Sequence, residues 1–93
     1  MTDDLSRIKI DVEPMRLRID SEPYVMFLGR QYVPVINVTE LKRNNDGFLI
    51  IAPVSISVVL HQWAEDGGQL QGIEFWINKT GNEKFSTYEL QMS

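Results

Sequence analysis

Apolar and polar residues alternate along much of this chain, and a period of two restricts it to folds built from half-buried β-strands. In the segment 15–19, Met15, Leu17 and Ile19 fall on one face and two arginines fall on the other. Alternation and a high content of β-branched and aromatic residues predict further strands over residues 24–28, 31–38, 48–51, 72–78 and 84–91. Pro34 predicts that its strand lies at a sheet edge or contains a bulge, because proline has no N–H to donate to a neighbouring strand.

One segment has the period of a helix instead. The residues at positions i, i+3, i+4 and i+7 that would share its buried face are Ile56, Val59, Leu60 and Trp63. Pro53 suits the first turn of this helix, and the two glycines after Asp66 offer a left-handed cap. Residues 29–30 and 40–47 are predicted as a turn and a loop between strands.

Four or five strands with one helix before the final hairpin favour a mostly-β fold in a chain of 93 residues. We expect a small five-stranded, partly open barrel of the OB type. The alternative is an α+β fold, in which the helix covers one face of an antiparallel sheet.

Size and composition indicate a single domain over residues 1–93, with residues 1–6 as a frayed polar terminus. The longest apolar stretch, 48–60, is broken by a proline and two serines and is too short to cross a bilayer. The first residues are acidic and do not form the apolar core of a secretory signal. We therefore expect a cytoplasmic protein, inside the host cell if it is viral, that makes no contact with membranes.

The sequence offers little to support catalysis or metal binding. It has no cysteine, and His61 is its only histidine. A nucleophile–base pair or a zinc site needs more of these residues, and no phosphate-binding or calcium-binding loop motif is present. We expect a binding protein that is not an enzyme and that uses no cofactor and no metal.

The aromatic residue most informative about binding is Trp76. It alternates out of phase with Phe75 and Ile77, so it should lie on the opposite face of its strand, beside Glu74 and Asn78. An outward indole can stack on any nucleobase, at about 1–3 kcal/mol per base, although a barrel strand can also bury both of its faces.

Basic residues near turns could contact phosphates. If the fold is an OB barrel, Arg30, Tyr32, Lys42 and Arg43 would lie near its usual binding face. The full set that we predict to contact nucleic acid is Trp76, Tyr32, Tyr88, Arg30, Lys42, Arg43, Lys79 and Lys84.

The final hairpin resembles that of a known group of proteins. The run from Leu70 to Gly81, followed by the run from Lys84 to Leu90, is similar to the terminal hairpin of small phage and archaeal OB-type proteins. The resemblance covers roughly residues 24–91. It implies an OB fold and the binding of single-stranded DNA or RNA in replication or repair.

The charge of the chain favours a second reading. A formal net charge of −4 argues against electrostatic binding of nucleic acid by the surface as a whole, although it permits a local basic groove. The alternative function is a protein-interaction module, such as a small viral accessory or inhibitory protein, since aromatic residues also anchor protein interfaces. The edge strand with Pro34 could also pair between two copies and give a homodimer.

Overall fold

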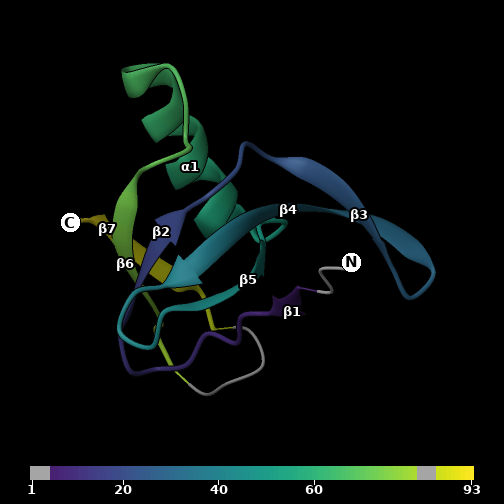
Figure 1. The fold of residues 1–93 in the computed structure, drawn as a ribbon, viewed down its shortest axis with the longest axis horizontal. Helices are drawn as coiled ribbons and strands as arrows, with labels where there is room; N and C mark the ends of the chain where they lie inside the picture. Colours follow the sequence, from purple (N-terminus) through teal and green to yellow (C-terminus); the bar gives the residue numbers. More distant parts are fainter. Residues whose placement is uncertain (1–4, 82–85) are drawn as a thin grey trace.

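A computed structural model describes residues 5–81 and 86–93 of the chain (Figure 1). These residues form a mostly-β fold with a single helix, which confirms the expected class. The elements, in chain order, are β1 (Ser6–Arg7), β2 (Met15–Ile19), β3 (Tyr24–Leu28), β4 (Gln31–Glu40), β5 (Asn45–Ile50), α1 (Val54–Gly67), β6 (Glu74–Lys79) and β7 (Tyr88–Met92).

The seven strands of the described chain form one sheet in the order β1-β5-β4-β2-β6-β7, with β3 paired to β4 outside this path. Apart from the parallel pair β1–β5, all neighbours are antiparallel. The sheet is open, because β1 and β7 lie at its two ends and do not pair with each other. The expected count of five strands is therefore wrong, and the sheet does not close into a barrel.

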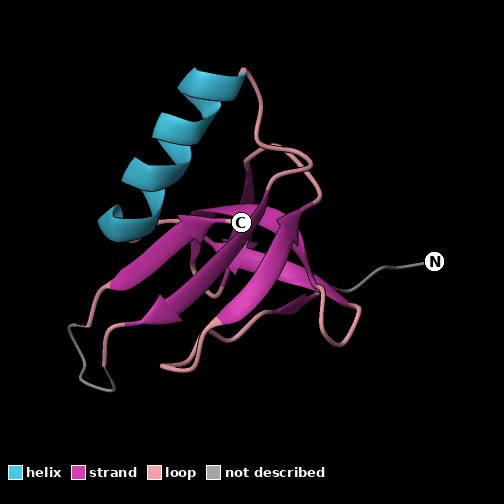
Figure 2. Cartoon of the chain, turned by 90° about the vertical axis from the view of Figure 1, so that its left-hand side faces the viewer, coloured by secondary structure: helices cyan, strands magenta, loops and turns pink. Residues whose placement is uncertain are grey.

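The core lies between the sheet and α1, which covers one face of the sheet (Figure 2). Leu17 and Phe75 lie directly opposite each other on β2 and β6, and both are fully buried. Ile56 and Leu60 contribute the buried face of the helix, and the ring of Trp63 meets Phe75 edge-on at 5.6 Å. The alternation and the helical period predicted this core, except that Val59 is only half-buried and lies outside it.

The helix begins and ends close to where the sequence places it. Pro53 is the residue before its first turn, with extended backbone angles that do not continue the helix. Gly68 ends it in the left-handed conformation, with φ of 86°, and its N–H donates to the carbonyl of Ala64. The glycine cap is confirmed, whereas Pro53 lies one residue before the first turn in which the sequence placed it.

The N-terminal segment differs from the expected frayed terminus. Residues 1–4 lie outside the described chain, but Ser6 and Arg7 form β1 alongside β5, and Ile8 and Ile10 are buried in the core. The close approach of β1 requires a glycine, since a Cβ at Gly47 would lie 2.5 Å from the carbonyl oxygen of Ser6.

Two predicted boundaries in the middle of the chain are also wrong. The loop expected over 40–47 shrinks to a turn over 41–44, in which Asn44 has a positive φ of 52°. Residues 45–47 belong to β5 because they pair with β4 in regular register. In the last hairpin β7 begins at Tyr88, and the predicted strand start at Lys84 lies outside the described residues.

A two-stranded arm projects from the sheet (Figure 1). β2 and β3 pair with the same side of β4, one after the other, and β3 takes the half that begins at Gln31. The partner of β4 on its other side, β5, reaches no farther than Val35 in the register, so the arm has only two strands. Its tip is a two-residue turn in which Gly29 has φ of 62°, as a type II′ hairpin turn requires.

Candidate nucleic-acid interface

The outer face of the sheet, opposite the helix, carries an exposed tryptophan. Trp76 is 44% exposed, whereas its neighbours on β6, Phe75 and Ile77, are fully buried. The prediction that Trp76 points outward is therefore confirmed. Across the ladders its neighbours are Arg16 on β2 and Gln91 on β7.

Arg16 is held beside the indole by an ion pair. Its Nη2 donates a hydrogen bond to Oε1 of Glu74 at 2.7 Å, and both side chains are partly exposed. The same nitrogen lies 3.4 Å from the hydroxyl of Ser93. Glu74 thus offsets the charge of Arg16 but fixes the guanidinium on the same face as Trp76.

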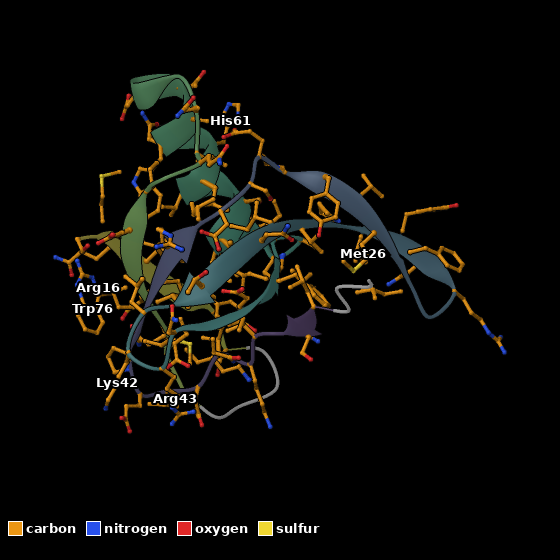
Figure 3. All side chains as sticks on the ribbon, viewed as in Figure 1. Arg16, Met26, Lys42, Arg43, His61 and Trp76 are labelled. Atoms are coloured by element: carbon orange, nitrogen blue, oxygen red, sulfur yellow. The ribbon has the colours of Figure 1, made fainter. Side chains whose placement is uncertain are left out.

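A hollow of about 430 Å³ lies on one side of Trp76. It is formed by the segment before β2, the turn between β4 and β5, and the indole itself. Figure 3 shows Arg16, Trp76, Lys42 and Arg43 on this part of the molecule. Its charged lining residues are the basic Lys9, Arg16, Lys42 and Arg43 and the acidic Asp11, Glu13 and Glu40. We call this hollow the Trp76 groove.

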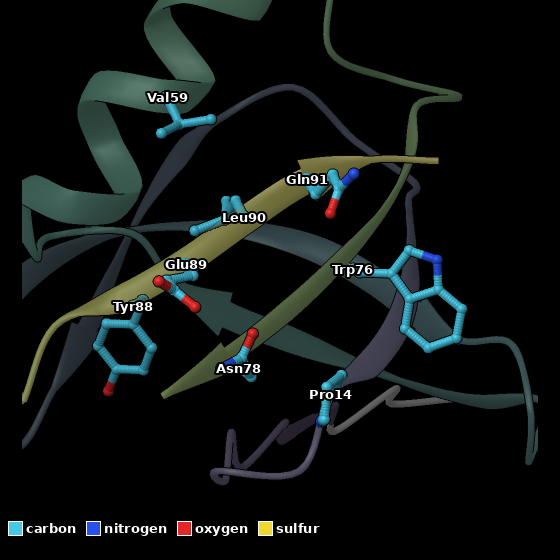
Figure 4. Close-up of a pocket in the computed structure, with 8 residues that line it drawn as sticks. All are labelled: Pro14, Val59, Trp76, Asn78, Tyr88, Glu89, Leu90 and Gln91. Carbon is cyan, nitrogen blue, oxygen red and sulfur yellow. The ribbon is translucent and has the colours of Figure 1, made fainter. Parts of the chain in front are cut away.

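A second hollow, of about 800 Å³, lies on the other side of Trp76 (Figure 4). It shares Trp76 and Pro14 with the Trp76 groove and continues along β7 to Tyr88. Asn78 and Gln91 also line this hollow, so two side-chain amides lie next to the indole. The second hollow extends around the edge strand β7: Asn78 and Gln91 line it on the face of Trp76, whereas Tyr88 lies on the helix side, packed against the core.

The predicted site residues fall into three places. Lys42 and Arg43 lie with Trp76 in the Trp76 groove. Tyr88 and Lys79 lie opposite each other across the β6–β7 ladder, and both line a smaller hollow of about 410 Å³ near the start of α1. Both are half-buried.

The remaining predicted residues do not join this site. Arg30 and Tyr32 belong to the arm, at the end of β4 that is opposite to Lys42. Ten residues of strand separate the two ends by about 30 Å. The expectation that Arg30 and Tyr32 would lie with Lys42 and Arg43 is therefore wrong, and Lys84 lies outside the described residues.

A second arginine of β2, Arg18, is paired with a carboxylate next to its own strand. Nε of Arg18 donates to Oδ1 of Asp20 at 2.9 Å, and this hydrogen bond, with the charge of the carboxylate, raises the pKa of the guanidinium. The hydroxyl of Thr39 lies 2.5 Å from Asp20 and 2.9 Å from Asp46. Arg18 therefore offsets two carboxylates on the outer face and is not counted in the candidate site.

Sequence reasoning omitted Arg16 and Lys9 from the site. Arg16 joins it through the register of β2 against β6, and Lys9 through the path of the chain after β1. The only local signal was that Arg16 lies on the polar face of its strand.

Within the described ranges, no helix has the length and apolar character needed to cross a membrane. The same residues contain no group of three or more metal-ligating side chains. In the comparisons with known proteins, no family model, no curated protein and no solved structure matches this chain.

Proposed function

We propose that this protein binds single-stranded nucleic acid along the outer face of its sheet. The observation that carries the proposal is the exposed indole of Trp76, which lines both hollows and adjoins Lys42 and Arg43. A partly exposed indole can stack on a base, and cations that line the same hollow can contact the backbone of the same strand. The resemblance of residues 70–90 to the hairpin of OB-type single-strand binders supports the same function.

The charges of the Trp76 groove set how strong this binding can be. Arg16 is paired with Glu74, so Lys9, Lys42 and Arg43 are the cations left for phosphates, opposite three carboxylates. Each neutralised phosphate of a single strand contributes about 0.7 to the log–log slope of affinity against salt. Two or three phosphates therefore predict a slope of about −1.4 to −2.1, which is much shallower than that of a strongly basic binder.

Fluorescence titration with a mixed-sequence single-stranded oligonucleotide tests the proposal. Trp63 also emits, so a Trp63→Phe variant leaves Trp76 as the only tryptophan. We expect saturable quenching in this variant, weakened by salt with the slope given above. Quenching that is absent at low salt in a folded sample would contradict the proposal.

Matched variants locate the binding surface. In anisotropy measurements with a labelled oligonucleotide, the Trp76→Ala variant should bind with about tenfold lower affinity, because it loses the stacking of one base. Tyr32→Ala removes a more exposed aromatic ring from the arm and should leave the affinity unchanged. Equal losses in both variants would place binding elsewhere.

A second candidate function, protein interaction, is favoured by a different observation. The arm exposes Val25, Phe27 and Tyr32, which are apolar or aromatic and lie far from the Trp76 groove. Aromatic side chains of this kind anchor protein interfaces.

A further inference from the structure

The arm has an open edge along β3. Among the described residues β3 packs against β4 and no other element, so one side of the strand carries no partner. Val25 is 63% exposed, Phe27 58% and Tyr32 72%, and the rings of Phe27 and Tyr32 lie 4.8 Å apart. A two-stranded ribbon with this much exposed apolar surface is only marginally stable on its own.

The position of Pro34 shows which backbone groups face the open edge. The carbonyl of Pro34 accepts the N–H of Ile51, so its backbone faces the β5 side and the pair Val25–Pro34 has no ladder hydrogen bonds. Pairs alternate along an antiparallel ladder, so Phe27–Tyr32 is also a pair of this type. The N–H and C=O groups of Val25 and Phe27 therefore point away from β4, toward the open edge.

The two edges of the arm differ in their protection. The edge of β4 within the arm is short, because Pro34 has no N–H and its carbonyl already accepts from Ile51, which leaves the outward backbone groups of Tyr32. The edge of β3 has no proline and no charged residue between Tyr24 and Leu28. Edge strands that stay exposed normally carry such features, so β3 has the character of a strand that is covered.

Charge on the arm indicates what covers it. The only charged residue at the tip is Arg30, and the nearest charges at the base are Asp20 and Glu22. In an antiparallel pair of two arms, the tip of each arm reaches the base of the other. A second copy therefore brings a cation to a carboxylate at each end of the pair.

One register satisfies both the hydrogen bonds and the charges. With Met26 opposite Met26 of the second copy, Val25 faces Phe27, and their outward groups form four hydrogen bonds across the two-fold axis. The same register brings Arg30 beside Glu22. If Val25 instead faced itself, Phe27 would meet Pro23, which has no N–H to donate.

We infer that the protein forms a homodimer in which β3 pairs antiparallel with β3 of a second copy, centred on Met26. The four strands β4-β3-β3-β4 then form one continuous sheet between the two bodies. Val25 and Phe27 become cross-strand neighbours on one face, a stabilising aromatic–aliphatic pair. Glu22 also accepts the N–H groups of Leu70 and Gln71, which fixes its carboxylate at the base of the arm.

Cysteine substitution tests the register directly, because the chain has no cysteine of its own. In the dimer the two copies of residue 26 lie about 4.5 Å apart at Cα, within the range of a disulfide. The two copies of residue 28, on the same face of β3, lie about 13 Å apart along the strand. Met26→Cys should therefore give a cross-linked dimer on oxidation, and Leu28→Cys should not.

Proline substitution tests the pairing without breaking the arm. Val25→Pro removes an N–H that faces the second copy, and symmetry makes this a loss of two hydrogen bonds. We expect the dimer to dissociate at about tenfold higher concentration or more, measured by sedimentation. Tyr32→Pro removes an outward N–H from the other edge of the arm and is the matched control, which should stay dimeric.

Charge reversal gives a third variant that leaves the strands intact. Arg30→Glu should weaken the dimer several-fold, with an effect that fades at high salt. A wild-type chain that stays monomeric at high concentration would overturn the inference, as would cross-linking of both cysteine variants or of neither. A monomer whose tryptophan fluorescence is still quenched by oligonucleotide would leave the proposed function intact, so the two proposals fail separately.

Discussion

At the scale of single residues, the attachment of β1 depends on the missing side chain of Gly47. A Cβ at this position would lie 2.5 Å from the backbone oxygen of Ser6 and 2.6 Å from the side chain of Ile8. The backbone oxygen cannot move without shifting β1, so Gly47→Ala should destabilise the fold by about 1–3 kcal/mol. Urea denaturation followed by circular dichroism measures this loss.

The same variant also reports on the N-terminal segment. Loss of the β1–β5 contact would free Ile8 from the core, where it is now buried. Hydrogen exchange at the amide of Ile8, which donates to Phe48, should then become faster in Gly47→Ala than in the wild type. Unchanged stability and exchange would mean that β1 does not pass so close to β5.

Single residues also show how far the sequence could predict the site. The outward direction of Trp76 followed from Phe75 and Ile77 because the period of a strand is a local property. The position of Arg16 beside Trp76 depends on the register between β2 and β6, which lie almost 60 residues apart in the chain. No pattern within either strand determines that register, so the neighbours of the indole could not be predicted.

At the scale of elements, the end of α1 separates two adjacent glycines with different roles. Gly68 has φ of 86°, a conformation that strains any residue with a Cβ, and Gly67 is the last residue of the helix. Gly68→Ala should lower the stability by about 1 kcal/mol. Gly67→Ala has open space for its methyl group and should raise the stability by about 0.5 kcal/mol.

Thermal unfolding of the two variants, compared with the wild type, gives the measurement. Opposite signs at neighbouring positions would establish that backbone conformation, and not the loss of flexibility alone, sets the requirement for glycine. A stabilising effect at both positions would mean that the helix does not end in the left-handed conformation at Gly68.

Elements with a clear period were easier to predict than their partners. The strand over residues 15–19 and the helix over residues 54–67 lie where alternation and the flanking proline and glycines placed them. β1 was missed, because two residues are too few to show a period. It pairs with β5, about 40 residues away, so only the tertiary structure reveals it.

At the scale of the whole molecule, closure of the sheet could not be read from the chain. A barrel and an open sheet need the same alternating strands, and they differ only in whether the two end strands pair. Here the ends are β1 and β7, which do not pair, and the helix covers one face in place of closure. The arm also depends on which strands pair. β4 is longer than any of its partners, so β3 pairs with the part of β4 that β2 leaves free.

The proposed homodimer makes the stability of the whole molecule depend on its concentration. If folded chains are paired through β3, unfolding also separates them, and the melting temperature must rise with protein concentration. A tenfold increase in concentration stabilises a dimer by about 1.4 kcal/mol, or about 0.7 kcal/mol per chain. For a domain of this size that corresponds to a rise of roughly 3–5 °C.

Calorimetry or circular dichroism over a range of concentrations tests this dependence. We expect the rise in the wild type and in Tyr32→Pro, and a nearly constant melting temperature in Val25→Pro at concentrations where its dimer is no longer populated. A fully monomeric protein would give the same melting temperature at every concentration in all three. A rise that persists undiminished in Val25→Pro would show self-association through a surface other than β3, because that substitution removes both a donor and an apolar side chain from the proposed β3–β3 contact.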